Sequence, residues 1–297
     1  AVSVISQPAT VATPAERLIG NTFAGSPTVG ECPVFPADNP WNTPIDTAPL
    51  HPDSAAIVAR IQSSGGTRLH PDFGENFDYG IPYVVVDGST QVPVEYAAYG
   101  EESDPGPFPI PLDAPIEGGA DADGDRHAIA VDASTCRLYE LYRAFPGGTS
   151  WTADNGATWD LQSNALRPAG WTSADAAGLP ILPGLVRYDE VAAGEIRHAI
   201  RITFSRTRRA YIHPATHFAS NRTDADLPPM GLRLRLRAGF DTSQLTGQAR
   251  VIAVAMQRYG VIVADNGSNW FFQGAPSAGW NDDDLNQLKT ISGSEFE

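Results

Sequence analysis

The chain is short of cysteine, methionine and lysine. Its 297 residues include two cysteines, Cys32 and Cys136, and two methionines. Because the cysteines lack C-x-x-C spacing and there are no further thiols, a cysteine-rich metal site is excluded. We expect one disulfide between them; two inert buried thiols are the alternative. A disulfide, together with a first segment typical of a chain after removal of a signal peptide, favours a secreted, extracellular protein.

Positive charge is also scarce. Lysine occurs once, at Lys289, and 20 basic residues face 35 acidic ones, which gives a formal net charge of −15. Such a surface repels phosphate backbones and anionic lipid, which argues against nucleic acid and membranes as partners. No apolar run approaches the roughly 18 residues of a membrane-spanning helix. Neutral substrates or divalent cations fit better, and we expect a monomer without an organic cofactor.

Long helical periodicity is rare, and short alternating segments dominate. We predict a mainly β fold, a β-sandwich or distorted β-barrel with about three short peripheral helices. Residues 1–30 are small, polar and unperiodic and are predicted to form a flexible N-terminal leader, whereas 31–297 is predicted to form a single β-rich globular domain. Turn signals predict three hairpins: 83–86 with 91–96, 127–131 with 136–142, and 261–264 with 270–273. Further strands are expected at 198–204, 210–213 and 232–237, and helices at 51–62, from 242 or 243 to 260, and from 281.

Two strands open with the same four residues, Arg126-His127-Ala128-Ile129 and Arg197-His198-Ala199-Ile200. In the central hairpin, a register that matches the apolar residues sets His127 opposite Glu140. An imidazole beside a carboxylate at the edge of a buried face can act as an acid/base pair. The alternative is a structural hydrogen bond that satisfies a half-buried histidine, and the same alternative applies to His198.

Three aspartates alternate in a short run before the first of these histidines. Asp121, Asp123 and Asp125, with a glycine between the last two, can point hard oxygen ligands at one calcium ion. The run resembles the aspartate loops of calcium-binding repeats such as those of integrin-like propellers, over about a dozen residues and in a single copy. It departs from the EF-hand loop because Arg126 stands where that loop needs glycine. A solvated acidic turn is the alternative to a calcium site.

The segment 146–186 is irregular but rich in tryptophan, which is typical of a binding or active-site loop. Its Asp160 is a candidate catalytic acid. Aromatic faces stack on sugar rings while amide, carboxylate and guanidinium groups bind hydroxyls. The candidate substrate-binding residues are Trp159, Asn164, Arg167, Trp171 and Asp175. The alternative is that the tryptophans anchor the loop in the core.

These features together predict a secreted carbohydrate-active enzyme, a glycoside hydrolase or polysaccharide lyase, whose partner is a polysaccharide or oligosaccharide. Its catalytic candidates are His127, Glu140, Asp160 and His198. One alternative is a non-catalytic, calcium-dependent glycan-binding or surface protein. A second is a metal-dependent hydrolase or oxidase in which His213 and His217 join one of the repeated histidines. The chain has no Gly-x-Ser-x-Gly elbow, dinucleotide fingerprint or phosphate loop.

Overall fold

The computed structural model describes residues 23–297, and its regular structure is mainly strands in several sheets, with short helices. The mainly β prediction is therefore confirmed at that level, while the sandwich or barrel arrangement stays a prediction. Residues 1–22 of the predicted leader lie outside the described residues. Its last part contains β1 (Thr28–Val29), which pairs antiparallel with β2 (Cys32–Pro33). No helix in residues 23–297 is long and apolar enough to cross a membrane.

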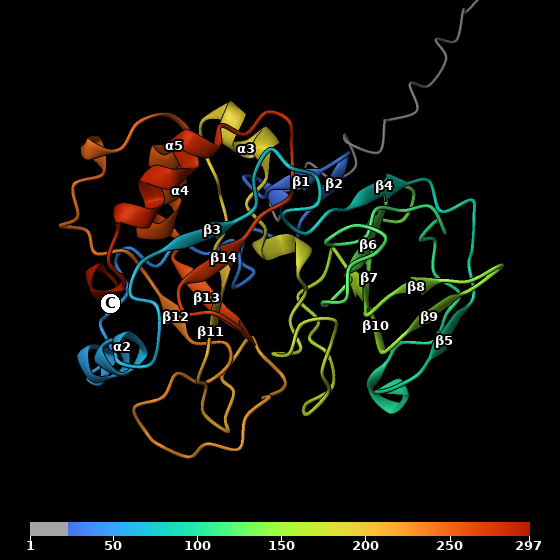
Figure 1. Ribbon diagram of the computed structural model, residues 1–297, viewed down its shortest axis with the longest axis horizontal. Coiled ribbons are helices and arrows are strands. Elements are labelled where there is room, and N and C mark those ends of the chain that lie inside the picture. Colours follow the sequence, from blue (N-terminus) through green and yellow to red (C-terminus); the bar gives the residue numbers. More distant parts are fainter. Residues whose placement is uncertain (1–22) are drawn as a thin grey trace, which may run out of the picture.

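One half of the molecule consists of strands β4 to β10, which we call the strand half (Figure 1). Its four-stranded sheet has the order β10-β7-β6-β4, in which β4 runs parallel to β6 and the other neighbours are antiparallel. These strands are β4 (Val84–Val86), β6 (Ala128–Asp132), β7 (Arg137–Tyr142) and β10 (Asn155–Asp160). A small sheet of order β5-β9-β8 comprises β5 (Val94–Tyr96), β8 (Phe145–Pro146) and β9 (Trp151–Ala153).

The other half carries the α-helices and a mixed five-stranded sheet, and we call it the helical half (Figure 1). The order of its sheet is β12-β13-β11-β14-β3, with β11 parallel to β13 and antiparallel to β14. Its strands are β3 (His70–Asp72), β11 (Ile200–Phe204), β12 (Arg233–Leu234), β13 (Val261–Asn266) and β14 (Phe271–Gln273). Its helices are α2 (Ser54–Gln62), α3 (Tyr188–Ala193), α4 (Gly247–Arg258) and α5 (Asp282–Asn286). Short 3-10 turns occur at Gly100–Glu102, Leu182–Gly184, Thr242–Gln244, Gln287–Thr290 and Gly293–Glu295.

The helices follow most of their sequence signals, but α4 starts later than the predicted 242 or 243, because residues 242–244 form a separate 3-10 turn. The predicted helices correspond to α2, α4 and α5, and the Asn281 side chain accepts a hydrogen bond from the Asp284 backbone N–H, as an N-cap residue does. Helix α4 buries Ala249, Ile252 and Met256, the apolar side expected from their spacing. Helix α3 was not predicted; it is six residues long, too short for a periodic signal.

Strand β6 lies between two hydrophobic cores. Ile129 and Val131 belong to the large core, whereas Ala128 and Ala130 belong to a smaller core formed with the β5-β9-β8 sheet. All five residues of the strand are buried. Neighbouring residues of a strand point to opposite faces, so β6 packs against the large core with one face and against the smaller core with the other. The residues that precede β6 therefore have a fixed position beside the helical half.

The central hairpin forms, but its predicted register is wrong. Val131 lies opposite Leu138 rather than Cys136, and Glu140 lies opposite Ile129 rather than His127. The Asp132 carboxylate accepts hydrogen bonds from the turn that follows it, at 2.7 to 2.9 Å. Cys136 adopts a left-handed φ of 51° within the turn. The turn therefore includes Cys136. The pair next to the turn is Asp132 with Arg137, whereas the predicted pair is Val131 with Cys136.

The other two predicted hairpins are also wrong. Strand β4 pairs with β6 and β5 pairs with β9, both in parallel, so the segments 84–86 and 94–96 belong to different sheets. Likewise β13 and β14 lie on either side of β11 and do not pair with each other. A turn signal shows that the chain reverses, but the partner of each strand depends on distant segments. The segment 210–213 forms a single bridge, between Tyr211 and Met230, instead of a strand.

The predicted disulfide is present. Cys32 and Cys136 are bonded across 104 residues, and the bond joins β2 to the turn between β6 and β7. A cross-link that closes a long loop lowers the conformational entropy of the unfolded chain. The disulfide should therefore contribute substantially to the stability of the molecule.

We expect the double variant Cys32→Ala/Cys136→Ala to unfold with a free energy lowered by about 4 to 5 kcal/mol, because its unfolded state is no longer constrained. Chemical denaturation of both proteins measures this difference. As a control, dithiothreitol should lower the midpoint of the wild type and leave that of the double variant unchanged. Equal stabilities of the two proteins would show that the cross-link is dispensable.

Candidate functional site

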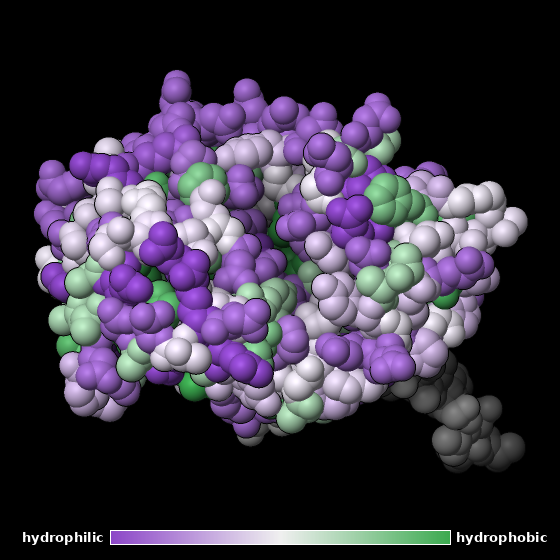
Figure 2. Space-filling view, turned by 60° about the horizontal axis from the view of Figure 1, so that its bottom comes forward, coloured by the Kyte–Doolittle hydropathy of each residue, from purple (hydrophilic) through white to green (hydrophobic). Residues whose placement is uncertain are grey.

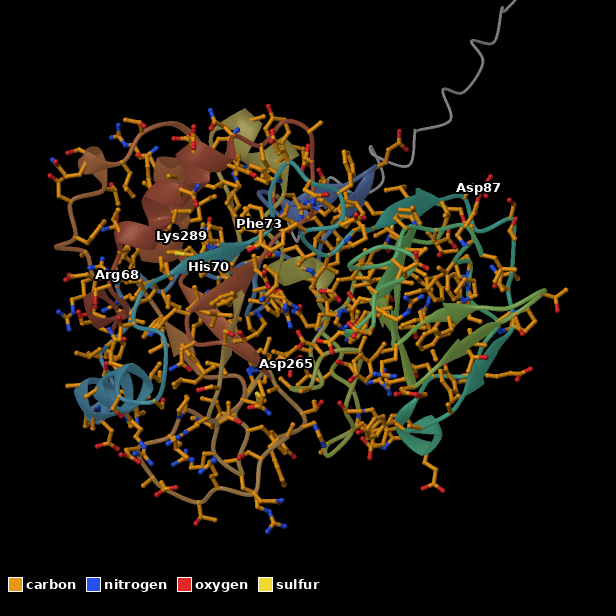
Figure 3. All side chains as sticks on the ribbon, viewed as in Figure 1. Arg68, His70, Phe73, Asp87, Asp265 and Lys289 are labelled. Atoms are coloured by element: carbon orange, nitrogen blue, oxygen red, sulfur yellow. A yellow bond between two sulfur atoms is a disulfide. The ribbon has the colours of Figure 1, made fainter. Side chains whose placement is uncertain are left out.

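A polar cavity of about 300 Å³ lies where the two halves meet. The strand half supplies Tyr99, Asp125 and Tyr142, and the helical half supplies Asp265 and Asn266. The rest of the lining comes from two loops, with Thr172, Ser173, Ala174 and Ala176 from one and His217 and Ala219 from the other. Figure 3 labels Asp265 near the boundary between the halves. Figure 2 shows a mostly hydrophilic face of the molecule that is hollowed near its centre.

Asp265 stands at the carboxyl end of β13, which runs parallel to β11. The register between these strands shifts so that Val263 pairs with Ile202 and Asp265 pairs with Thr203, which leaves Ala264 as an extra residue. A bulge of this kind bends a strand and changes the direction of the side chains that follow it, and Asp265, the next residue, lines the cavity. The carboxyl ends of adjacent parallel strands are where open sheets commonly bind ligands. Local backbone geometry thus places the Asp265 carboxyl group in the cavity wall.

The surroundings of the Asp265 carboxyl group favour its protonated form. Burial first, and then the Asp175 and Asp125 carboxylates, outweigh Arg201 and the hydrogen bond from the Asn266 backbone N–H, and together raise its pKa from the ordinary 3.8 to about 8. The guanidinium of Arg201 is 3.9 Å from the Asp265 carboxylate. Because that distance is too long for a hydrogen bond, Arg201 lowers the pKa of Asp265 only through its charge, which does not offset the effect of burial. Near neutral pH this group can donate a proton.

Arg201 forms its hydrogen bonds to a carboxylate with Asp175 and not with Asp265. Its Nε and Nη2 atoms donate to the two oxygens of Asp175 at 2.9 and 2.8 Å, and its Nη1 donates to Gln273 at 2.6 Å. Both Arg201 and Asp175 are almost completely buried. Burial alone would lower the pKa of Arg201, but the facing carboxylates raise it above its ordinary value. Asp265 is consequently the second carboxyl group beside a single guanidinium.

His127 is a buried side chain that contacts the cavity wall through the backbone of Ala174. Its Nδ1 lies 2.6 Å from the Glu117 carboxylate and its Nε2 lies 3.0 Å from the Ala174 carbonyl oxygen. Burial disfavours the charged ring, but the Glu117 carboxylate outweighs burial and raises the pKa of His127 to about 9. In turn, the pKa of Glu117 lies below its usual range because His127 outweighs the effect of burial. Since two acceptors face the ring, His127 holds the Ala174 loop and is unsuited to remove a proton.

His217 presents a different arrangement. Its Nδ1 lies 2.7 Å from the Ala176 carbonyl oxygen, and its ring stacks on Phe218 with an interplanar angle of 4°. A carbonyl oxygen accepts a hydrogen bond, so Nδ1 must carry the proton. In the neutral ring the Nε2 lone pair is then an acceptor. Because His217 lines the cavity, it is a candidate proton acceptor or hydroxyl-binding residue.

The predicted pairing of His127 with Glu140 is wrong, because Glu117 takes that place. Glu140 is fully buried and accepts hydrogen bonds from the backbone N–H groups of Ile181 and Leu182 at 2.9 to 3.0 Å. Burial raises its pKa to about 7. It is not among the residues that line the cavity. In this position Glu140 anchors the 181–182 backbone to β7.

The two other catalytic candidates lie in separate places. Asp160 is exposed at the end of β10 and accepts a hydrogen bond from the Gln162 backbone N–H at 2.9 Å. His198 is buried, with its Nε2 3.0 Å from the Glu190 carboxylate and its Nδ1 near a backbone carbonyl. Neither residue lines the cavity. The repeated histidines therefore belong to two different hydrogen-bond networks.

The predicted substrate-binding residues brace the loop that forms one wall of the cavity. Arg167 donates to Asp104 at 2.6 Å and to the Thr172 carbonyl oxygen at 2.8 Å, and its guanidinium lies over the rings of Trp159 and Trp171. Asn164 is hydrogen-bonded to Asp38 and Asn39. Asp175 holds Arg201, as described above. Their contacts run to the protein itself and give the loop a fixed shape.

The three alternating aspartates do not converge on one point. Among the described residues there is no group of three or more His, Cys, Asp or Glu side chains arranged to hold a metal ion. Arg126 has a left-handed φ of 50°, and its Nη1 donates to the carbonyl oxygens of Ala120 and Ala122 at 2.8 and 2.7 Å. The loop is thus fastened by an arginine, and of its aspartates Asp125 reaches the cavity. Calcium binding at Asp121, Asp123 and Asp125 stays a prediction.

Sequence reasoning missed the central residue of the site, Asp265. The signal was present, since an apolar run of four residues is followed directly by Asp265 and Asn266. That pattern fits the carboxyl end of a buried parallel strand as well as it fits a hairpin turn. Glu117 was hidden in a loop dense in proline and acids. His217 was considered as a metal ligand and not as a residue of this cavity.

No protein-family model matches the chain, and no curated protein or solved structure gives a significant match to it. The chemistry of the site therefore rests on its own geometry.

The site should make stability depend on pH in a defined direction. Asp265 favours folding while it is protonated, so its contribution is present below its unfolded pKa and is lost as the pH rises toward about 8. The raised pKa of His127 acts in the same direction, from its ordinary 6.5 up to about 9. We expect the free energy of unfolding to fall from about pH 5 to about pH 9, and Asp265→Asn to flatten the lower part of this decline.

Urea denaturation at a series of pH values measures this dependence. The matched control is Asp160→Asn, which removes an exposed carboxylate and should leave the slope as in the wild type. Parallel curves for the wild type and Asp265→Asn would contradict the assignment of a proton to Asp265.

Proposed function

We propose that the protein is a secreted glycoside hydrolase that acts on neutral polysaccharides or oligosaccharides at this cavity. One arrangement carries the proposal: the carboxyl groups of Asp265 and Asp125 line the same cavity, and burial with the neighbouring carboxylates raises the pKa of Asp265 to about 8. Glycoside hydrolysis typically uses one carboxylic acid as proton donor and a second carboxylate on the other side of the scissile bond.

Asp265 would protonate the oxygen of the leaving sugar as the glycosidic bond breaks. Asp125 would face the positive charge that develops on the sugar ring, where a carboxylate lowers the energy of the transition state. The Nε2 of His217 offers an acceptor for a hydroxyl group or for the attacking water. Arg201 and Asp175 act as positioning residues, because they determine the protonation of Asp265 without lining the cavity.

The lining also favours a neutral substrate. Among the described residues that line this cavity there is no lysine or arginine, whereas hydroxyl and amide groups come from Tyr99, Tyr142, Thr172, Ser173 and Asn266. A polysaccharide lyase must compensate the negative charge of a uronate, and this cavity offers carboxyl groups instead of cations. The net charge of −15 disfavours anionic chains as well. Hydrolysis of a neutral glycan therefore fits better than lyase chemistry.

The disulfide is consistent with a secreted enzyme, since such bonds persist in oxidising compartments. The neutral chemistry of the lining would also suit a glycan-binding protein that leaves its ligand intact. The two functions differ in their products, so an activity test separates them.

We expect Asp265→Asn to lower kcat by at least about 100-fold on the neutral polysaccharides that the wild type cleaves, because asparagine cannot donate the proton. Release of reducing ends from a panel of neutral polysaccharides, resolved by chromatography, measures turnover. Asp160→Asn is the matched control and should keep wild-type activity.

The wild-type rate should also decline as the pH rises through about 8, where Asp265 loses its proton. Retained activity of Asp265→Asn would overturn the role of this residue. If the wild type retains glycans but releases no products, the protein is a binding protein instead of a hydrolase.

A further inference from the structure

A larger cavity lies elsewhere. It measures about 750 Å³ and shares no lining residue with the cavity around Asp265. The strand half contributes Val85 and part of the segment 113–120, while the helical half contributes 187–189 at the start of α3 and 275–277. Figures 1 and 3 share one view, in which α3 lies at the top and Asp265 lies well below it. The two cavities are therefore separate sites.

Arg187 supplies this cavity with hydrogen-bond donors that have no partner in residues 23–297. Its side chain is 1% exposed, and its Nη2 is taken by Glu190 at 2.8 Å and by the Thr28 carbonyl oxygen at 3.2 Å. Its Nε lies 3.6 Å from Asp189, and both Nε and Nη1 lack a hydrogen bond. A buried donor of a charged group that has no hydrogen-bond partner lowers the stability of the fold. A ligand oxygen that accepts a hydrogen bond from Arg187 would remove this cost.

Aromatic side chains surround the same opening. Phe77 is 64% exposed although it is a large hydrophobic residue, and it lines the cavity together with Tyr83 and Tyr188. Val85, another lining residue, is 46% exposed. Exposed aromatic faces beside a cavity mark binding sites and stack well on the apolar faces of sugar rings. The rim therefore suits a ligand with flat apolar faces.

The charges of the lining select against an anion. Asp78, Asp113 and Asp189 line the cavity with Arg187 as the one cation, and Arg187 is already paired with Glu190. An anionic ligand would meet an excess of carboxylates. Carboxylates accept hydrogen bonds from hydroxyl groups, and the unpaired guanidinium nitrogens of Arg187 are donors suited to hydroxyl or ring oxygens. A neutral sugar has rings with apolar faces, hydroxyl groups that donate hydrogen bonds to carboxylates, and oxygens that accept them from a guanidinium. It therefore matches this lining.

We propose that this cavity is a second, non-catalytic binding site for a neutral oligosaccharide. It takes the substrate class of the proposed function, but it does not require cleavage to occur. Its volume lies within the range of pockets that enclose most of a small ligand. A site of this kind holds a glycan chain on the enzyme and raises the local concentration of substrate at the catalytic cavity.

Calorimetry on the full chain tests the proposal. The probes are cello-, xylo-, manno- and malto-oligosaccharides of about six rings, titrated into Asp265→Asn so that none is cleaved. We expect at least one to bind, and Phe77→Ala on the same background to weaken that binding by about tenfold through loss of stacking. The matched control is Phe145→Ala, another exposed aromatic residue, which lies outside this cavity and should leave the affinity unchanged.

Each outcome of this experiment either supports or overturns the proposed second binding site. An affinity that Phe77→Ala leaves unchanged, no binding of any neutral probe at millimolar concentration, or tighter binding of an oligogalacturonate would overturn the proposal. A Phe77-dependent affinity in a protein whose wild type cleaves no glycan would support this site and reject the hydrolase. Cleavage by a wild type whose glycan affinity is independent of Phe77 would do the reverse.

Discussion

The site depends on one buried interaction, the paired hydrogen bonds between Arg201 and Asp175. Arg201 belongs to β11, which has β13 on one side and β14 on the other, so its backbone is held from both edges. Asp175 takes two of its donors and Gln273 takes a third. A buried guanidinium that is satisfied in this way forms no hydrogen bond with the nearby carboxyl group of Asp265, which accepts one from the Asn266 backbone N–H. Burial, and after it the Asp175 carboxylate that occupies Arg201, therefore raise the pKa of Asp265.

The same interaction is also one of the links between the two halves of the molecule, which share the large hydrophobic core. The loop that contains Ala174 and Asp175 is bonded to the helical half through Arg201 and to the strand half through the charged ring of His127. His127 is kept charged by Glu117, from the segment that also forms a wall of the larger cavity. Both hydrogen bonds involve charged side chains that are almost completely buried, Arg201 and His127. Such buried polar contacts favour one conformation of the loop. The cavity around Asp265 therefore has a fixed lining on both sides.

The sequence was informative where the cause of a feature is local or compositional. Asn281 predicted the start of α5 through its capping chemistry, and two cysteines without a metal-binding spacing predicted the disulfide. The apolar alternation of β6 and β7 predicted that these strands pair. Such features depend on a few neighbouring residues or on simple elimination.

The sequence was misleading where a feature depends on distant segments. Its turn signals did not reveal that β13 runs parallel to β11, and Asp265, which directly follows the predicted strand 261–264, is not among the sequence-based site candidates. A displacement of the β6–β7 ladder, caused by the turn that contains Cys136, moved Glu140 away from His127. The partner of His127 is ten residues upstream in a segment without periodicity. Pairings of this kind are set by tertiary packing, which no local pattern encodes.

The protonation of Asp265 is the central claim, and its most direct test is a carboxyl carbon-13 NMR titration of the protein labelled at aspartate. Comparison with Asp265→Asn assigns the signal. The account predicts that this carboxyl group titrates with a pKa of about 8. A pKa near the ordinary aspartate value of 3.8 would contradict it, because the residue would then be ionised at neutral pH and have no proton to donate.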